Sequence, residues 1–188
     1  MLVMKSNRLA FFYCGLTFFA VPVTFASPVC DVKAAVPQSA RTYAKTGDQE
    51  AWREFRSLQD VPALATDGGV SAQLWRDETG GSSVYMVEPG EDFWTHTRYC
   101  FDRGGQLERV SLEVRTAWGW DYRLEGSVVK GALRANSSEF FSTENERSIS
   151  KPRGASDISE ALKPTLYLTT SKLPFAHLFA HSFELPPK

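Results

Sequence analysis

The chain has 188 residues with 21 basic and 22 acidic side chains, so its formal net charge at pH 7 is −1. Hydrophobic residues make up 43% of the chain, a share typical of proteins with a buried core and not of disordered chains. The even charge balance argues against a nucleic-acid-binding protein, which would show a basic stripe, and we expect no nucleic-acid partner.

The first 26 residues have the features of a secretory signal peptide. Lys5 and Arg8 precede an apolar run over residues 9–26, and the run ends with small residues at Thr24 and Ala26. We expect cleavage after Ala26, export, and no membrane span in the processed protein. The location would be periplasmic in a Gram-negative source and extracellular otherwise. The alternative is an uncleaved anchor, since the run is close to the ~20 residues of a spanning helix.

Residues 27–188 would then form the mature chain, which has the length of a single domain. Removing residues 1–26 takes away two basic and no acidic residues, so the remaining net charge is −3. Such a small charge gives no reason to expect an anionic membrane surface as partner. Residues 27–46 are rich in alanine, proline and small polar residues without a period, which predicts an extended lead-in.

The cysteines predict one disulfide. Cys14 lies in the predicted signal peptide, so the mature chain keeps Cys30 and Cys100. An even pair in an oxidising compartment indicates a bond between them, which would restrict the unfolded chain by about 4 kcal/mol. The alternative is a pair of free thiols. The spacing excludes a redox Cys-x-x-Cys motif, and two cysteines alone do not form a structural zinc site.

The mature chain predicts one helix and then a series of strands. Asp48 is a candidate N-cap for a helix over residues 49–59, in which Trp52, Phe55 and Leu58 recur at three-residue spacing. From residue 70 to about residue 141, short β-rich runs alternate with glycine-containing turns. This pattern predicts an antiparallel meander of five or six strands.

The clearest unit in the meander is a hairpin over residues 92–116 with a turn at residues 102–105. We expect Thr97 to pair with Val110 and Thr95 with Leu112. Alternation then gives the hairpin one apolar and one polar face. Cys100 falls on the polar face, so its disulfide would draw the N-terminal segment across that face.

The C-terminal part contains two candidate short helices, over residues 158–162 and residues 175–183, after a polar loop. The predicted fold is therefore α+β. It has an N-terminal helix, a curved antiparallel meander of five or six strands, and C-terminal helical segments that cover the sheet.

Four aromatic residues are candidates for ligand binding. Trp118, Trp120 and Tyr122 form the densest aromatic cluster, and Trp94 could join them. Flat rings stack on sugars and line apolar pockets. The alternative is core packing, because this cluster continues the alternation of the apolar face.

The histidines give weak signals for chemistry. His177 and His181 are four residues apart and would share one face of a helix, as a metal pair requires. However, Leu178 stands where a zincin has its glutamate, and we predict no metal site. His96 is a candidate acid or base, but the chain has no Gly-x-Ser-x-Gly motif or other identifiable nucleophile.

These observations favour a non-catalytic exported protein, a carrier or accessory domain of the cell envelope. It would bind a small apolar or sugar ligand, or an envelope protein, and it would need no cofactor. The alternative is a secreted hydrolase that uses His96 or the pair His177 and His181.

Overall fold

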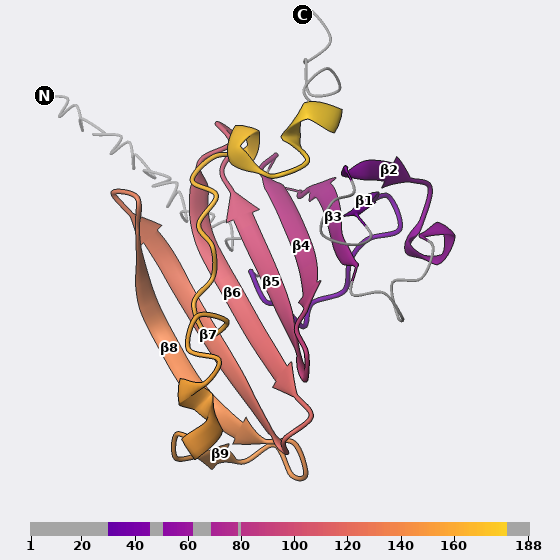
Figure 1. Ribbon diagram of the computed structural model, residues 1–188. Coiled ribbons are helices and arrows are strands. Elements are labelled where there is room, and N and C mark those ends of the chain that lie inside the picture. Colours follow the sequence, from indigo (N-terminus) through magenta and orange to yellow (C-terminus); the bar gives the residue numbers. More distant parts are fainter. Residues whose placement is uncertain (1–29, 46–50, 62–68, 79, 180–188) are drawn as a thin grey trace, which may run out of the picture.

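The computed structural model describes residues 30–45, 51–61, 69–78 and 80–179 (Figure 1). They form one antiparallel sheet with the strand order β2-β1-β3-β4-β5-β6-β7-β8-β9. The strands are β1 (Arg41–Lys45), β2 (Arg53–Phe55), β3 (Val70–Arg76), β4 (Ser82–Pro89), β5 (Phe93–Phe101), β6 (Leu107–Thr116), β7 (Trp120–Val129), β8 (Ala132–Ser142) and β9 (Ser148–Ile149). The predicted signal peptide, residues 1–26, lies outside the described residues.

The antiparallel sheet is confirmed, but the α+β prediction is wrong. The described residues are nearly all β, and their helical geometry is limited to four 3-10 turns. These are η1 (Leu58–Asp60), η2 (Arg153–Ser156), η3 (Thr170–Lys172) and η4 (Ala176–Leu178). The sheet has nine strands, of which β3 to β9 form an uninterrupted meander, against the five or six strands predicted. In the same part of the chain, no helix has the length and hydrophobicity needed to cross a membrane.

The N-terminal helix predicted for residues 49–59 is wrong over residues 51–59, which contribute strand β2 and the start of turn η1, while residues 49 and 50 lie outside the described residues. The Arg41 guanidinium in β1 donates two hydrogen bonds to the Glu54 carboxylate in β2, at 2.7 and 2.8 Å. The Trp52 ring packs on Phe175, with 5.0 Å between the ring centroids. An isolated helix of this length is marginally stable in water. Strand pairing and the contact with Phe175 therefore stabilise the chain more than the helix that the three-residue spacing predicted.

Residues 150–179 cross one face of the sheet as an irregular segment, which we call the C-terminal segment (Figure 1). Three prolines lie in it, and proline cannot donate a backbone hydrogen bond. Its backbone bonds instead to the β5–β6 loop, where Leu107 N donates to Leu168 O (3.0 Å) and Thr170 N to Gly105 O (2.9 Å). The segment therefore covers the sheet without helices.

The two C-terminal helices of the prediction are accordingly wrong. Residues 158–162 form successive turns, in which Ile158 O accepts from Ala161 N at 2.9 Å and, in a single bond of α-helical spacing, from Leu162 N at 3.3 Å. Within residues 175–179 the only helical geometry is the short turn η4, while residues 180–183 lie outside the described residues. Short stretches of this kind gain more from burying apolar side chains on the sheet than from helical hydrogen bonds.

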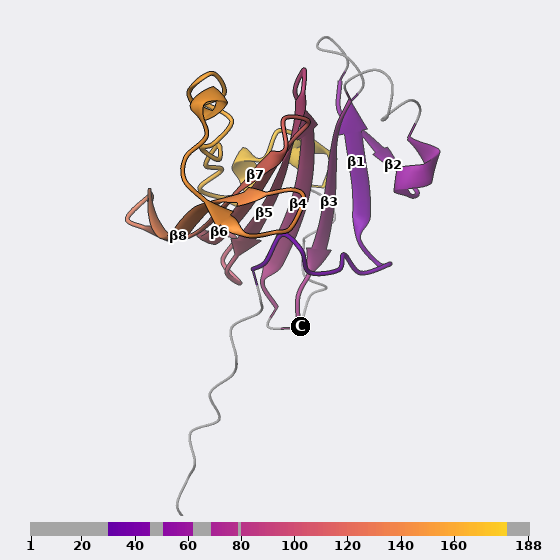
Figure 2. The same cartoon turned by 90° about the horizontal axis from the view of Figure 1, so that it is seen from below.

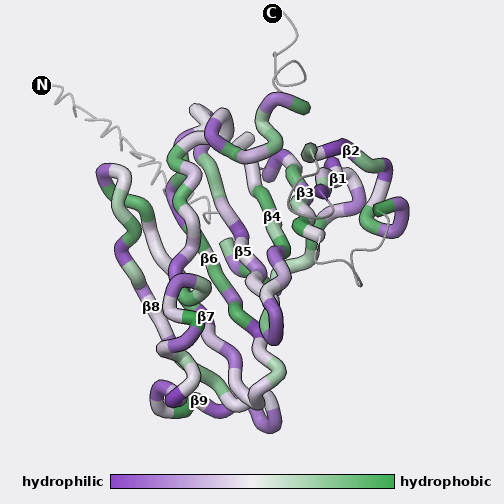
Figure 3. Tube along the Cα trace, in the orientation of Figure 1, coloured by the Kyte–Doolittle hydropathy of each residue, from purple (hydrophilic) through white to green (hydrophobic). Residues whose placement is uncertain are grey.

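The core lies between the apolar face of the sheet and the C-terminal segment. Tyr43 in β1 is fully buried and stacks on Phe175, with ring centroids 4.6 Å apart. A second cluster contains Leu112, Val114, Trp120, Tyr122 and Leu124 together with Ala155 and Leu162 of the segment. Hydrophobic and hydrophilic residues alternate along the central strands, as expected for a sheet with one apolar face (Figure 3).

Residues 30–40 cross the opposite, polar face of the sheet, so that the two terminal segments lie on different sides (Figure 2). The predicted disulfide between Cys30 and Cys100 is present. Next to it, Val32 N donates to Ser111 Oγ at 3.1 Å, and the Arg98 guanidinium donates to the carbonyl of Ala34. The prediction that the disulfide draws the N-terminal segment across the polar face is correct.

The β5–β6 hairpin differs from its predicted register by two residues. Thr97 pairs with Leu112 and Thr95 with Val114, because the loop extends to Gln106 and a bulge follows Cys100. A shift of two residues keeps every side chain on its face. The predicted division into an apolar and a polar face is therefore right, although the pairs are wrong.

The disulfide supports a first prediction. In a Cys30→Ala, Cys100→Ala double variant, the unfolded chain regains the freedom of a long loop, and the free energy of unfolding falls by about 4 kcal/mol. Urea denaturation of the two proteins measures this difference. Equal stabilities, or two alkylatable thiols in the native unreduced protein, would contradict it.

Candidate functional site

The polar face of the sheet has a covered half and an open half. Residues that pair directly across neighbouring strands lie in rows on one face of the sheet. The rows that contain Cys100 and Arg98 lie under residues 30–40, the N-terminal segment. In the open half, Trp94 is 49% exposed and the Arg115 side chain is 54% exposed. We call this half the open polar patch, and it consists of Trp94, His96, Glu113, Arg115, Asp121 and Arg123.

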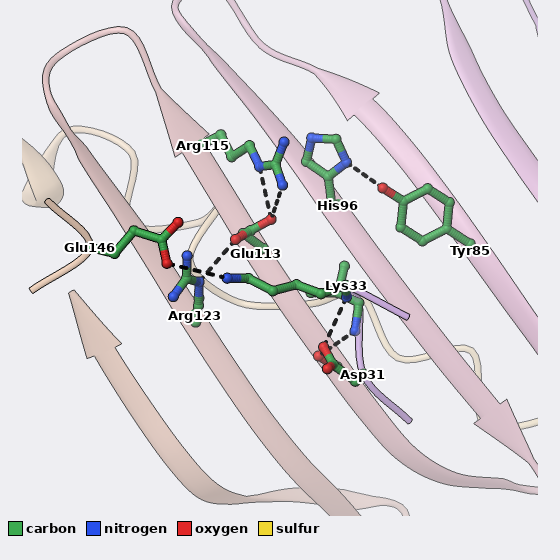
Figure 4. A network of polar contacts seen from close by, with 10 residues as sticks. Asp31, Lys33, Tyr85, His96, Glu113, Arg115, Arg123 and Glu146 are labelled. Carbon is green, nitrogen blue, oxygen red and sulfur yellow. Dashed lines mark hydrogen bonds and ion pairs between the residues drawn. The ribbon is translucent and has the colours of Figure 1, made fainter. Parts of the chain in front are cut away.

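Glu113 is the buried centre of this patch (Figure 4). It is 1% exposed, and it accepts hydrogen bonds from Arg115 Nε at 2.8 Å and from Arg123 Nε at 2.9 Å. Burial by itself would raise the pKa of Glu113, but the hydrogen bond from Arg123 and the charge of Arg115 outweigh it and lower the pKa. An ionised Glu113 thus holds two guanidinium groups on neighbouring strands.

His96 lies beside this network, and its Nδ1 is 2.7 Å from the hydroxyl oxygen of Tyr85 (Figure 4). Burial lowers the pKa of His96, the charge of Arg115 lowers it further, and Glu113 opposes both. The imidazole is therefore neutral at pH 7. In the described part of the chain, His96 forms no hydrogen bond with a serine, threonine or cysteine. The arrangement supports binding more than nucleophilic catalysis.

The structure separates the four aromatic residues predicted to bind a ligand. Trp120 and Tyr122 are buried in the core and pack on Phe140. Trp118 is 44% exposed in the β6–β7 turn, with its ring 5.9 Å from that of Trp120. Trp94 lies on the opposite face. The four rings do not form one site, and ligand binding stays a prediction for the two exposed tryptophans.

A pocket of about 690 Å³ lies between the β5–β6 loop and the C-terminal segment. Its wall contains guanidinium, carboxylate, hydroxyl, imidazole and aromatic groups from Arg76, Ser82, Asp102, Arg103, Thr170, Ser171, His177 and Phe179. Gly105 has φ +75° at this wall, and a Cβ there would come within 2.8 Å of Thr170 Oγ1. Glycine therefore allows the loop and the segment to meet.

This pocket was not predicted from the sequence. The glycines of the β5–β6 loop indicated a turn, but Arg76, this loop and Thr170 are far apart in the chain, and no sequence pattern links them. His177 lies in the pocket wall, whereas its predicted partner His181 lies outside the described residues. Across the described ranges, no group of three His, Cys, Asp or Glu side chains could hold a metal ion.

No protein-family model matches the chain, and no curated protein or solved structure matches it. The geometry of the pocket and of the open polar patch is therefore the basis for a functional proposal.

The charge network predicts unequal effects of two substitutions. Glu113→Gln leaves two arginines without their buried counter-ion, and we expect the free energy of unfolding to fall by about 3 kcal/mol. Arg115→Gln removes a half-exposed partner, for which we expect a loss below ~1 kcal/mol. Urea denaturation of both variants tests this difference. If Glu113→Gln were as mild as Arg115→Gln, the network would not stabilise the fold.

The environment of His96 predicts lower stability in acid. The folded pKa lies below the unfolded value of 6.5, so the unfolded chain takes up a proton first as the pH falls through that value. We expect the free energy of unfolding to decrease between about pH 7.5 and about pH 5.5, and to decrease less in His96→Gln. Denaturation at the two pH values measures it, with His177→Gln as the control for loss of a histidine. The same decrease in wild type and His96→Gln would refute the prediction.

Proposed function

We propose that this protein is an exported, non-catalytic binding protein of the cell envelope that holds a small polar ligand in the pocket between the β5–β6 loop and the C-terminal segment. The main support for this proposal is the size of the pocket. Its volume of about 690 Å³ lies within the range of small-molecule sites, roughly 300 to 1,000 Å³.

The groups in the wall indicate the class of ligand. Arg76 and Arg103 bring two guanidinium groups, which match the planar geometry of a carboxylate. The hydroxyls of Ser82, Thr170 and Ser171 can donate to and accept from ligand hydroxyls, and Phe179 adds an apolar surface. A small acid with several hydroxyl groups, such as a sugar acid, meets all three features.

The disulfide supports the exported location in this proposal. Cys30 and Cys100 are bonded, and disulfides persist mainly in oxidising compartments such as the periplasm or the extracellular space. The alternative function, a secreted hydrolase that uses His96 or His177 with His181, has no comparable support. In the described residues, neither His96 nor His177 forms a hydrogen bond with a serine, threonine or cysteine nucleophile.

Blocking the pocket tests the proposal. Ser171 lines the pocket, whereas the adjacent Lys172 does not, and both side chains are exposed. With glucuronate as probe, we expect an increase of the melting temperature for wild type and Lys172→Trp, because a ligand that binds only the folded state stabilises it. In Ser171→Trp, where the new ring fills the pocket, we expect no increase.

Glucose is the uncharged control for glucuronate in the same experiment, and we expect a smaller increase with it. The proposal is wrong if glucuronate leaves the melting temperature of wild type unchanged. An equal increase in Ser171→Trp would place the ligand elsewhere and would also contradict it.

A further inference from the structure

The open polar patch presents a tryptophan to solvent beside fixed polar groups. Trp94 in β5 is directly opposite Arg115 in β6, and Arg115 is directly opposite Asp121 in β7. Residues opposed in this way have side chains about 5 Å apart on one face of the sheet. A half-exposed indole ring, a guanidinium group and a carboxylate therefore lie on one face of the sheet.

The polar groups of the patch are held in place before any ligand arrives. Glu113 fixes the guanidinium groups of Arg115 and Arg123, and the Arg123 guanidinium lies 4.4 Å from the centroid of the Phe141 ring. Asp121 lies beside them, but its Oδ1 is buried and its carboxylate accepts a backbone hydrogen bond from Thr116. The patch therefore offers ordered guanidinium donors beside a half-exposed indole ring.

The patch has no excess of positive charge, which argues against an anionic ligand. Glu113 and Asp121 offset Arg115 and Arg123, Glu139 lies directly opposite Arg123, and the neighbouring His96 is neutral at pH 7. An uncharged ligand with many hydroxyl groups fits better, because guanidinium and carboxylate groups can each pair with two hydroxyls at once. Its apolar ring face can stack on an indole.

We propose that the open polar patch binds a neutral oligosaccharide chain, with one sugar ring stacked on Trp94 and an adjoining hydroxyl bonded to the exposed Arg115 guanidinium. The patch extends across β5, β6 and β7, about 10 Å at the usual strand spacing, and the ion pair of Lys33 with Glu146 borders it beside Arg123 (Figure 4). Such an open surface suits a chain that passes across it, whereas the pocket on the C-terminal segment suits a small molecule. The two sites are independent of one another.

Two tryptophans of similar exposure allow a matched experiment. Trp94 is 49% exposed on the patch and Trp118 is 44% exposed in the β6–β7 turn, so both alanine variants should fold, which equal melting temperatures would verify. The probes are cellohexaose, maltohexaose and chitohexaose, measured by isothermal titration calorimetry and tryptophan fluorescence. We expect at least one to bind wild type, and Trp94→Ala to weaken that binding about tenfold or more. Trp118→Ala should bind as wild type does.

Two further variants separate this site from the rest of the protein. Arg115→Gln should also weaken the binding of the oligosaccharide. Ser171→Trp should leave this binding unchanged, because the pocket takes no part in it. A high salt concentration should have little effect, since the ligand is uncharged. The proposal is overturned if none of the three oligosaccharides binds at about 10 mM, a concentration that would detect even weak affinity. Equal losses in Trp94→Ala and Trp118→Ala would overturn it as well.

Discussion

The structure depends on how the C-terminal segment covers the apolar face of a sheet that has no helix to cover it. Phe175 is fully buried, and its ring lies within 6 Å of the rings of Tyr43, Trp52 and Phe179. These contacts join the segment to strand β1 and to the stretch before β2. The same course of the chain brings Thr170, Ser171 and His177 to the β5–β6 loop, so that the packing of the core also forms the pocket.

The polar face is covered only in part, and this difference creates the second surface. The disulfide at Cys30 and the bond from Val32 to Ser111 hold the N-terminal segment over one half of the face. The other half keeps Glu113 buried among its arginines and leaves Trp94 exposed. The sheet thus presents the open polar patch on one face, and the pocket lies beside the C-terminal segment that covers the other face.

The alternation of apolar and polar residues made the sheet predictable. Contacts between residues distant in the sequence could not be predicted. Alternation assigned Cys100 to the polar face and Trp120 to the core-facing series, both as found. The spacing of Trp52 and Phe55 resembled a helix, because nothing in the sequence shows that Phe175 packs on Trp52. Similarly, the residue type does not distinguish Trp94 from Trp120. Trp120 is buried because the C-terminal segment covers its face of the sheet, and Trp94 is exposed because the N-terminal segment covers only part of the other face.

Phe175 is the contact that holds the C-terminal segment on the sheet, and the decisive measurement is the free energy of unfolding of Phe175→Ala. Truncation of a fully buried phenylalanine should cost about 3 to 5 kcal/mol. Leu168→Ala, at a 42% exposed position of the same segment, should cost less than ~1 kcal/mol. If the two variants were equally stable, the segment would not be part of the core and the pocket would lose its wall.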